Sequence, residues 1–184
     1  MTYPKKCVVD TNVPITANLS IAPATIPDEQ VDCVIHCVDI LHRIISNGGL
    51  VLDAGGEIFD EYKKHLSIAG SPGIGNSFMK WVHDHQWNFP IEDRVSITKE
   101  NETYAEFPQD QQLKTFDKSD MKFVAVANAH KDNPSIIQAT DAKWWKWSRI
   151  LKKNNIHVLF MDDALAQKGC RKKNRCGNKD CNKC

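Results

Sequence analysis

Four acidic residues in this chain stand where an apolar run ends or an amphipathic run begins. Asp10 follows the run 7–9, Asp141 follows the run 135–140, and Glu61 and Asp120 open amphipathic stretches. Four carboxylates gathered at one place repel one another unless a cation lies among them. Because hard oxygen ligands select Mg²⁺ or Mn²⁺, the pattern predicts a divalent metal site made by Asp10, Glu61, Asp120 and Asp141.

Each acidic residue also has a simpler interpretation. Asp10 could cap a turn, and Asp117 is more typical of a helix N-cap than of a ligand. Asp53, at the end of another apolar run, could be an outer-sphere residue or a turn residue, and Asp60 is more typical of a surface acid. The prediction therefore depends on the combination of four positions rather than on any one of them.

The elements that must position these acids alternate in type along the chain. Helical periodicity and helix boundaries predict helices over 28–47, 57–66, 76–85, 119–130 and 142–153, and short β-branched runs predict strands over 7–9, 50–52, 95–98, 135–139 and 157–161. This alternation is typical of an α/β protein, here a three-layer α/β/α sandwich around a parallel sheet of about five strands. The carboxyl ends of parallel strands share one edge, where ligands bind.

Four segments in this order resemble the motifs of PIN-domain nucleases. They are residues 8–13 (VVDTNV), 59–66 (FDEYKKHL), 116–127 (FDKSDMKFVAVA) and 138–141 (QATD), and the similarity spans about residues 5–162. The resemblance implies the strand order 3-2-1-4-5 and a metal-dependent phosphodiesterase site with Asp10, Glu61, Asp120 and Asp141 as catalytic residues and metal ligands. It also implies that Thr11 and Asn12 supply polar support in the first loop.

The fourth motif departs from the commonest pattern of this family. A second acid often follows the first by two residues or more, whereas Lys143 and Trp144 stand at those places here. The missing acid affects the expectation of a second metal ion and leaves the expectation of the first unchanged. A divalent ion at such a site lowers the pKa of a bound water and neutralises charge that develops on the phosphate. The carboxylates have to stay ionised for this role, so none needs a raised pKa.

The charge of the chain is divided unevenly. The total is +1, from 24 basic and 23 acidic residues, but residues 168–184 carry seven basic residues and one acid. That segment is therefore +6 and the remainder is −5. We expect a nuclease domain over 1–167 and a basic, cysteine-rich tail over 168–184. Lys143 and the tail residues Arg171, Lys172, Lys173 and Arg175 are the candidates for contacts with nucleic-acid phosphates.

Four of the seven cysteines fall in the tail, at Cys170, Cys176, Cys181 and Cys184. The last pair has the Cys-x2-Cys spacing of zinc sites and the first pair does not. A Zn²⁺ site, a reduced tail and a disulfide all remain open. The other three, Cys7, Cys33 and Cys37, are more typical of buried structural thiols.

Aromatic residues cluster after the fourth motif, at Trp144, Trp145 and Trp147. Helical spacing cannot turn all three outward, so at least two should be packed, and one could stack on a base of a single strand.

Other enzyme classes that act on phosphate groups fit the sequence less well. A haloacid-dehalogenase-type phosphatase would need an acid at Asn12, a receiver domain would need one near Thr98, and the glycines at 70, 73 and 75 lack the lysine of a phosphate loop.

We therefore expect a metal-dependent endonuclease, with single-stranded RNA favoured over DNA as substrate. The alternatives are a nuclease on DNA single strands or flaps, and a nucleic-acid-binding module with weak or no catalysis. The resemblance to small nucleases of toxin or defence type implies partners of that kind, namely an antitoxin or defence-system protein and a second copy of the chain. The short apolar run near the N-terminus does not suit a signal peptide, so a cytoplasmic location and no membrane partner are expected.

Overall fold

The computed structural model describes residues 3–176, with side chains up to residue 171. It is a mixed α/β protein in which a small parallel sheet has the order β1-β6-β7, formed by β1 (Cys7–Val9), β6 (Ser135–Gln138) and β7 (Val158–Phe160). A second parallel pair joins β2 (Leu52–Asp53) to β3 (Arg94–Val95), and an antiparallel pair joins β4 (Lys99–Glu100) to β5 (Thr103–Tyr104).

A backbone bridge links the first two sheets. Cys7 pairs with Leu50, the Cys7 N–H donates to Gly49 O at 2.9 Å, and the Val51 N–H donates to Cys7 O at 2.9 Å. The approach is close enough that a Cβ on Gly49 would stand 2.1 Å from the Lys5 carbonyl oxygen, and Gly49 has a φ of +89°. Only glycine satisfies both requirements, so Gly49 sets the contact between the segment before β2 and the first strand.

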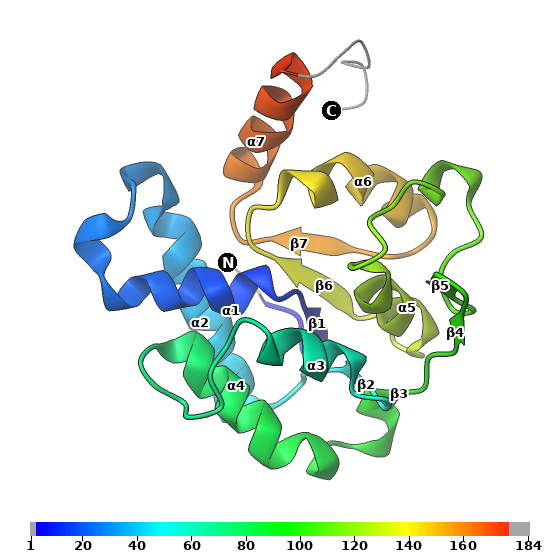
Figure 1. Ribbon diagram of the computed structural model, residues 1–184, viewed down its shortest axis with the longest axis horizontal. Coiled ribbons are helices and arrows are strands. Elements are labelled where there is room, and N and C mark those ends of the chain that lie inside the picture. Colours follow the sequence, from blue (N-terminus) through cyan, green and yellow to red (C-terminus); the bar gives the residue numbers. More distant parts are fainter. Residues whose placement is uncertain (1–2, 177–184) are drawn as a thin grey trace.

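The α-helices of the described residues are α1 (Asn12–Ala17), α2 (Val31–Asn47), α3 (Glu57–Lys63), α4 (Ile74–His85), α5 (Met121–Ala129), α6 (Ala142–Lys153) and α7 (Asp163–Cys176). In the view of Figure 1, α6 and α7 lie on one side of β6 and β7 while α1 to α4 gather on the other side of β1. Helix α5 packs against β1 and β6. Helix α2 buries Val34, Leu41 and Ile44 of its apolar positions, together with Cys33, Cys37 and Ile40, whereas Val31 and Ile35 are exposed.

Three segments differ from the sequence-based expectation. Residues 12–17 form α1 instead of a loop, because the Asp10 carboxylate and the Asp10 and Thr11 carbonyls accept the first helical N–H groups despite Pro14. Residues 99–104 form a hairpin that has no apolar periodicity to signal it. Helix α7 continues across the expected domain boundary at 167/168, and Cys170 within it is buried.

The packing predictions for single residues are confirmed. Cys7, Cys33 and Cys37 are buried. Trp144 and Trp147 are buried against Phe116, and Trp145 packs its ring on Phe160. None of the three tryptophans faces solvent fully, so they belong to the contact between α6 and its surroundings. Among the described residues, no helix has both the length and the apolar character that crossing a bilayer requires.

A buried ion-pair cluster closes the amino ends of β1 and β3. The Asp93 carboxylate, 4% exposed, is 2.7 Å from Lys6 Nζ and 3.2 Å from His130 Nε2. The Asp132 N–H donates to His130 Nδ1 at 3.0 Å, so a neutral His130 carries its proton on Nε2 and donates it to Asp93. Each polar atom of the imidazole is therefore satisfied inside the protein.

Removing the Asp93 carboxylate should destabilise the fold. Asp93→Ala leaves the buried His130 N–H without its acceptor and the Lys6 ammonium with only the exposed Asp132 carboxylate, 3.4 Å away, and we expect a loss of about 3 kcal/mol in the free energy of unfolding. Urea denaturation measures it. The matched control is Asp132→Ala, whose exposed carboxylate should contribute less than about 1 kcal/mol and whose backbone N–H remains. Equal losses in the two variants would contradict this assignment.

Candidate active site

Neighbouring parallel strands bring the first acidic residue to its place. In the β1–β6 pairing Val9 stands opposite Ile137, and the Asp10 N–H donates to Ile137 O at 3.0 Å. The Asp10 side chain therefore leaves the carboxyl end of β1 beside Gln138 of β6. It is 2% exposed and accepts the Asn12 N–H at 2.8 Å, which starts α1.

Asp141 and Asp120 come to the same region from the N-termini of two helices. Asp141 is the N-cap of α6, where its carboxylate accepts the Lys143 N–H at 2.9 Å. Asp120 is the N-cap residue of α5 but makes no capping hydrogen bond with its side chain. The Asp120 carboxylate is thus not used by its own helix, which leaves it available to a ligand.

Like charges and burial act together on these carboxylates. Burial raises the pKa of Asp10 to about 6, with the charge of Asp141 adding to the rise and the Asn12 N–H opposing it. Burial also raises the pKa of Asp120 to about 7, and the charges of Asp10, Asp117 and Asp141 add to it. The expectation that no carboxylate here needs a raised pKa therefore differs from the structure, because two of them are removed from water beside other acids.

Glu61 stands in a different electrostatic environment. Glu61 lies on α3, one residue before Tyr62. Tyr62 Oη donates to Val9 O at 2.5 Å, which ties α3 to the residue before Asp10. Burial on its own would raise the pKa of Glu61, but the cations of Lys64 and Lys122 outweigh it and the pKa lies below the ordinary value. Glu61 therefore stays ionised at neutral pH.

Lys122 was not a sequence candidate. It is 7% exposed, its Nζ donates to Ser119 O, and it lies 3.6 Å from Glu61 Oε2. This lysine thereby joins α3 to the turn that ends in Asp120. No sequence signal distinguishes it, since a lysine in the first turn of an apolar helix is ordinarily a surface residue.

Lys143 lies on the other side of the acidic group. Its Nζ is 2.7 Å from Asp117 Oδ2, and that hydrogen bond lowers the pKa of Asp117 to about 2. The same bond raises the pKa of Lys143, and the charges of Asp141 and Asp120 add to the rise. Asp117 is therefore a lysine partner and a turn acceptor for Ser119, and the expected role as a helix N-cap is wrong, because α5 begins at Met121 with Asp120 as its N-cap residue.

Asp53, Thr11 and Asn12 have structural positions as well. Asp53 accepts the N–H groups of Glu57 at 2.7 Å and Ile58 at 2.8 Å, so it caps α3. Asn12 acts through its backbone N–H, and Thr11 is 7% exposed with no partner for Oγ1 among the described residues. Thr11 and Asn12, which were expected to supply polar contacts in a loop, instead lie at the start of α1 next to Asp10.

The fit of a divalent cation can be tested on these residues. Carboxylate oxygens are suitable donors, and the charges of Asp10 and Asp141 are close enough to Asp120 to add to the rise in its pKa. Thr11 Oγ1 is a buried oxygen that lacks a hydrogen-bond partner among the described residues, whereas Gln138 Nε2, which also lacks one, is an N–H donor and cannot bind a cation. Charge and donor chemistry therefore fit a hard cation.

The geometry fits less closely. Among the residues described, no three His, Cys, Asp or Glu side chains are arranged as they stand to hold a metal ion. A cation at this place would have to draw the carboxylates toward itself, which side-chain rotation at the two helix N-caps would allow.

The tail candidates lie partly outside the described side chains. Arg171 is exposed on α7, and nothing is described for the side chains of Lys172, Lys173 and Arg175. Cys170 is buried and disulfide-bonded, whereas the side chain of Cys176 and all of Cys181 and Cys184 lie outside the described part. The Zn²⁺ site stays a prediction.

Comparison with protein families, curated proteins and solved structures finds no match to the chain.

Proposed function

We propose that the protein is a metal-dependent endonuclease that hydrolyses phosphodiester bonds, with single-stranded RNA as the preferred substrate. The observation that carries the proposal is the gathering of Asp10, Asp120 and Asp141 at the carboxyl ends of β1 and β6, where burial, with the charges of Asp10, Asp117 and Asp141 adding to it, raises the pKa of Asp120 to about 7. Acids placed so close without a function would be a net cost to stability, because each raises the energy of ionising the others.

The strand connections support the same proposal. Through the Cys7–Leu50 bridge the two parallel sheets follow one another as β3-β2-β1-β6-β7. Numbered as parallel strands in chain order, this is 3-2-1-4-5, the order that the motif resemblance implies. We propose that these strands act as one five-stranded sheet between two helical layers, with the acidic site at the edge where ligands bind to such sheets.

In this proposal each residue has a defined task. Asp10, Asp120 and Asp141 would hold one Mg²⁺ or Mn²⁺, which supplies an activated water and neutralises phosphate charge. Glu61, kept ionised by Lys64 and Lys122, would orient the attacking water as a hydrogen-bond acceptor. Thr11 Oγ1 and Gln138 Nε2 would then have a partner in the bound substrate or water.

A cleavage assay tests the function directly. The full chain is incubated with 5′-labelled single-stranded RNA and with DNA of the same sequence, each with Mn²⁺, with Mg²⁺ and with EDTA. Metal-dependent cleavage of RNA is expected, with less or no cleavage of DNA. Cleavage of the DNA strand alone would support the DNA nuclease instead. Binding of both strands without cleavage under any condition would overturn the proposal in favour of a nucleic-acid-binding module.

Lys143 should contribute to substrate binding. Its ammonium faces Asp117, Asp120 and Asp141 from the exposed side, where a phosphate held near the metal would meet it. In Lys143→Met we expect KM for the strand to rise about tenfold and the salt dependence of binding to weaken by about one phosphate contact. The control is Lys152→Met, an exposed lysine in the last turn of the same helix. An unchanged KM in Lys143→Met would remove this residue from the interface.

A further inference from the structure

A pocket of about 210 Å³ is lined by a segment that ends at Met121, the residue after Asp120. Its lining residues are Thr103, Phe107, Pro108, Gln109, Asp110, Gln111, Leu113, Lys114 and Met121. None of the four proposed catalytic acids lines it. All of the lining comes from the single segment 103–121, which ends at the N-terminus of α5. Because Met121 directly follows Asp120, the wall of the pocket and the acidic site share adjacent residues of the chain.

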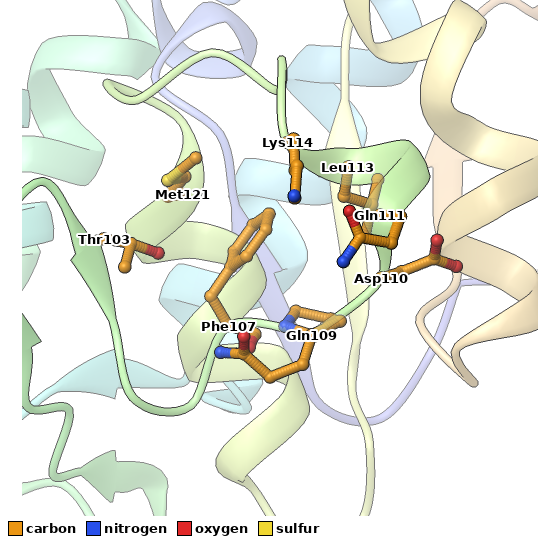
Figure 2. A pocket seen from close by; sticks show the side chains of 9 residues that line it. Thr103, Phe107, Gln109, Asp110, Gln111, Leu113, Lys114 and Met121 are labelled. Atoms are coloured by element: carbon orange, nitrogen blue, oxygen red, sulfur yellow. The ribbon is translucent and has the colours of Figure 1, made fainter.

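The segment that forms the pocket is held firmly by its neighbours. The Asp110 carboxylate accepts the Gln112 N–H at 2.8 Å and the Asn154 side-chain amide at 3.0 Å, which fixes the loop to the end of α6. Figure 2 shows this carboxylate turned toward that helix and away from the pocket. Leu113 is fully buried. The backbone of this loop is therefore anchored to the end of α6 by Asp110 and to the core by Leu113.

The chemical character of the pocket is mixed. Phe107 and Met121, each 6% exposed, form the apolar wall, whereas Gln109, Gln111 and Lys114 supply polar ends, and Figure 2 shows these side chains arranged around the Phe107 ring. Among the described residues, the side chains of Gln111 and Lys114 make no hydrogen bond or ion pair. A carboxamide carries both a donor and an acceptor, and a lysine carries a positive charge. The free polar groups thus match a flat ring with a polar edge and a nearby phosphate.

The volume of the pocket limits the size of the ligand that it can hold. Sites for drug-sized ligands occupy roughly 300–1,000 Å³, so a pocket of about 210 Å³ suits a single small ring system. Single-stranded nucleic acids are recognised by proteins through bases that are splayed out, packed on side chains and hydrogen-bonded along their edges. Because Met121 lines the pocket and directly follows Asp120, the nucleotide next to a phosphate at Asp120 would lie near the pocket.

We propose that the pocket receives one nucleobase of the substrate strand, next to the phosphodiester bond that is cleaved, with Gln111 contacting the base edge and Lys114 the adjoining phosphate. This inference rests on the proposed nuclease function, since that function brings a single strand to Asp120. Its consequence is a preference for a particular base beside the cut, at a position where the acidic site itself reads only phosphate.

Nucleotide binding tests the pocket separately from cleavage. The Asp10→Asn protein, labelled with ¹⁵N, is titrated in EDTA with AMP, GMP, CMP and UMP in turn. We expect saturable shifts of the Gln111 side-chain amide and of backbone amides in 103–121, with one nucleotide at least about threefold tighter than the weakest. Gln111→Ala should abolish that preference, whereas Gln112→Ala, one residue along and outside the pocket, should retain it. Absence of shifts with all four nucleotides would overturn the inference.

The second measurement is the cleavage kinetics of Gln111→Ala with Asp10 intact, compared with those of wild type. Gln111→Ala should raise KM about three- to tenfold and leave kcat nearly unchanged, as for loss of one hydrogen bond to the substrate. The effect should vanish on a strand that is abasic at the nucleotide beside the cut. Normal cleavage with no effect of Gln111→Ala would reject the pocket and keep the nuclease. Nucleotide shifts in 103–121 without any cleavage would reject the nuclease and leave a nucleotide-binding pocket.

Discussion

Asp10→Asn should lower metal-dependent cleavage by about 10³-fold while leaving the fold unchanged. The carboxylate leaves the end of β1 and is 2% exposed, so water cannot replace its charge at the proposed metal. Ligation by a neutral amide oxygen is weaker, and a loss of several kcal/mol of transition-state stabilisation corresponds to this factor. The fold should survive because an asparagine oxygen still accepts the Asn12 N–H that starts α1.

The measurement is the single-turnover rate on labelled RNA at saturating Mn²⁺, with circular dichroism and thermal denaturation as checks of folding. Asp60→Asn is the matched control, because Asp60 is an exposed acid on α3 that pairs with Lys63. It should cleave at the wild-type rate. A folded Asp10→Asn protein that cleaves within about threefold of wild type would show that Asp10 is a structural cap and nothing more.

The metal-free protein should become less stable as the pH rises from about 5 to 8. Burial raises the pKa of Asp10 to about 6 and that of Asp120 to about 7, both above the ordinary aspartate value of 3.8. A carboxyl group with a higher pKa in the folded chain than in the unfolded chain binds its proton more tightly when folded. Its contribution to stability is complete below the unfolded pKa and is lost as the pH rises through the folded pKa.

The expected loss is on the order of 3 kcal/mol in the free energy of unfolding between pH 5 and pH 8. Carboxylates with a lowered pKa, such as Asp117 and Glu61, act in the opposite sense. Their unfolded pKa values are 3.8 and 4.5, so the change in stability that they cause takes place below about pH 5 and is complete above it. The window from pH 5 to 8 is therefore governed by the two raised carboxyls among the acids of this site.

Urea denaturation in EDTA at pH 5 and at pH 8 measures this effect, with a second series in Mn²⁺. We expect Asp120→Asn to be more stable than wild type at pH 8 in EDTA, because the amide removes the buried negative charge. Mn²⁺ should stabilise wild type at pH 8 and leave Asp120→Asn less affected. Asp60→Asn should follow wild type throughout. A wild-type protein whose stability rises between pH 5 and pH 8 in EDTA would contradict the electrostatic description of the site.

Most of the elements around the site were predictable because their patterns are local. The buried face of α2 repeats with the period of a helix, α6 begins and ends at the expected residues, and β1 and β6 are short apolar runs bounded by polar residues. Helix α1 was missed because its first N–H groups are satisfied by the carboxylate and the carbonyls just before it, which periodicity does not reveal. The 99–104 hairpin was missed for a similar reason, since its strands have two residues each.

The candidate site divides in the same way. Strand-end and helix-start positions identified Asp10, Asp120 and Asp141, since parallel strands put their carboxyl ends at one edge. Sequence spacing does not show that Lys122 is buried against Glu61, that Lys143 reaches Asp117, or that Asp53 caps α3. These contacts join residues whose proximity depends on how the helices pack.

The sequence by itself determined which residue types stand at the ends of the strands, how the helices and strands alternate, and how the charge is split between residues 1–167 and 168–184. Only the tertiary structure decided how far each carboxylate is removed from water, which lysine faces it, and that segment 103–121 encloses a pocket next to Asp120. The reason is physical. Residue type and periodicity are properties of neighbours along the chain, whereas desolvation, charge interaction and enclosure depend on atoms brought together from distant segments.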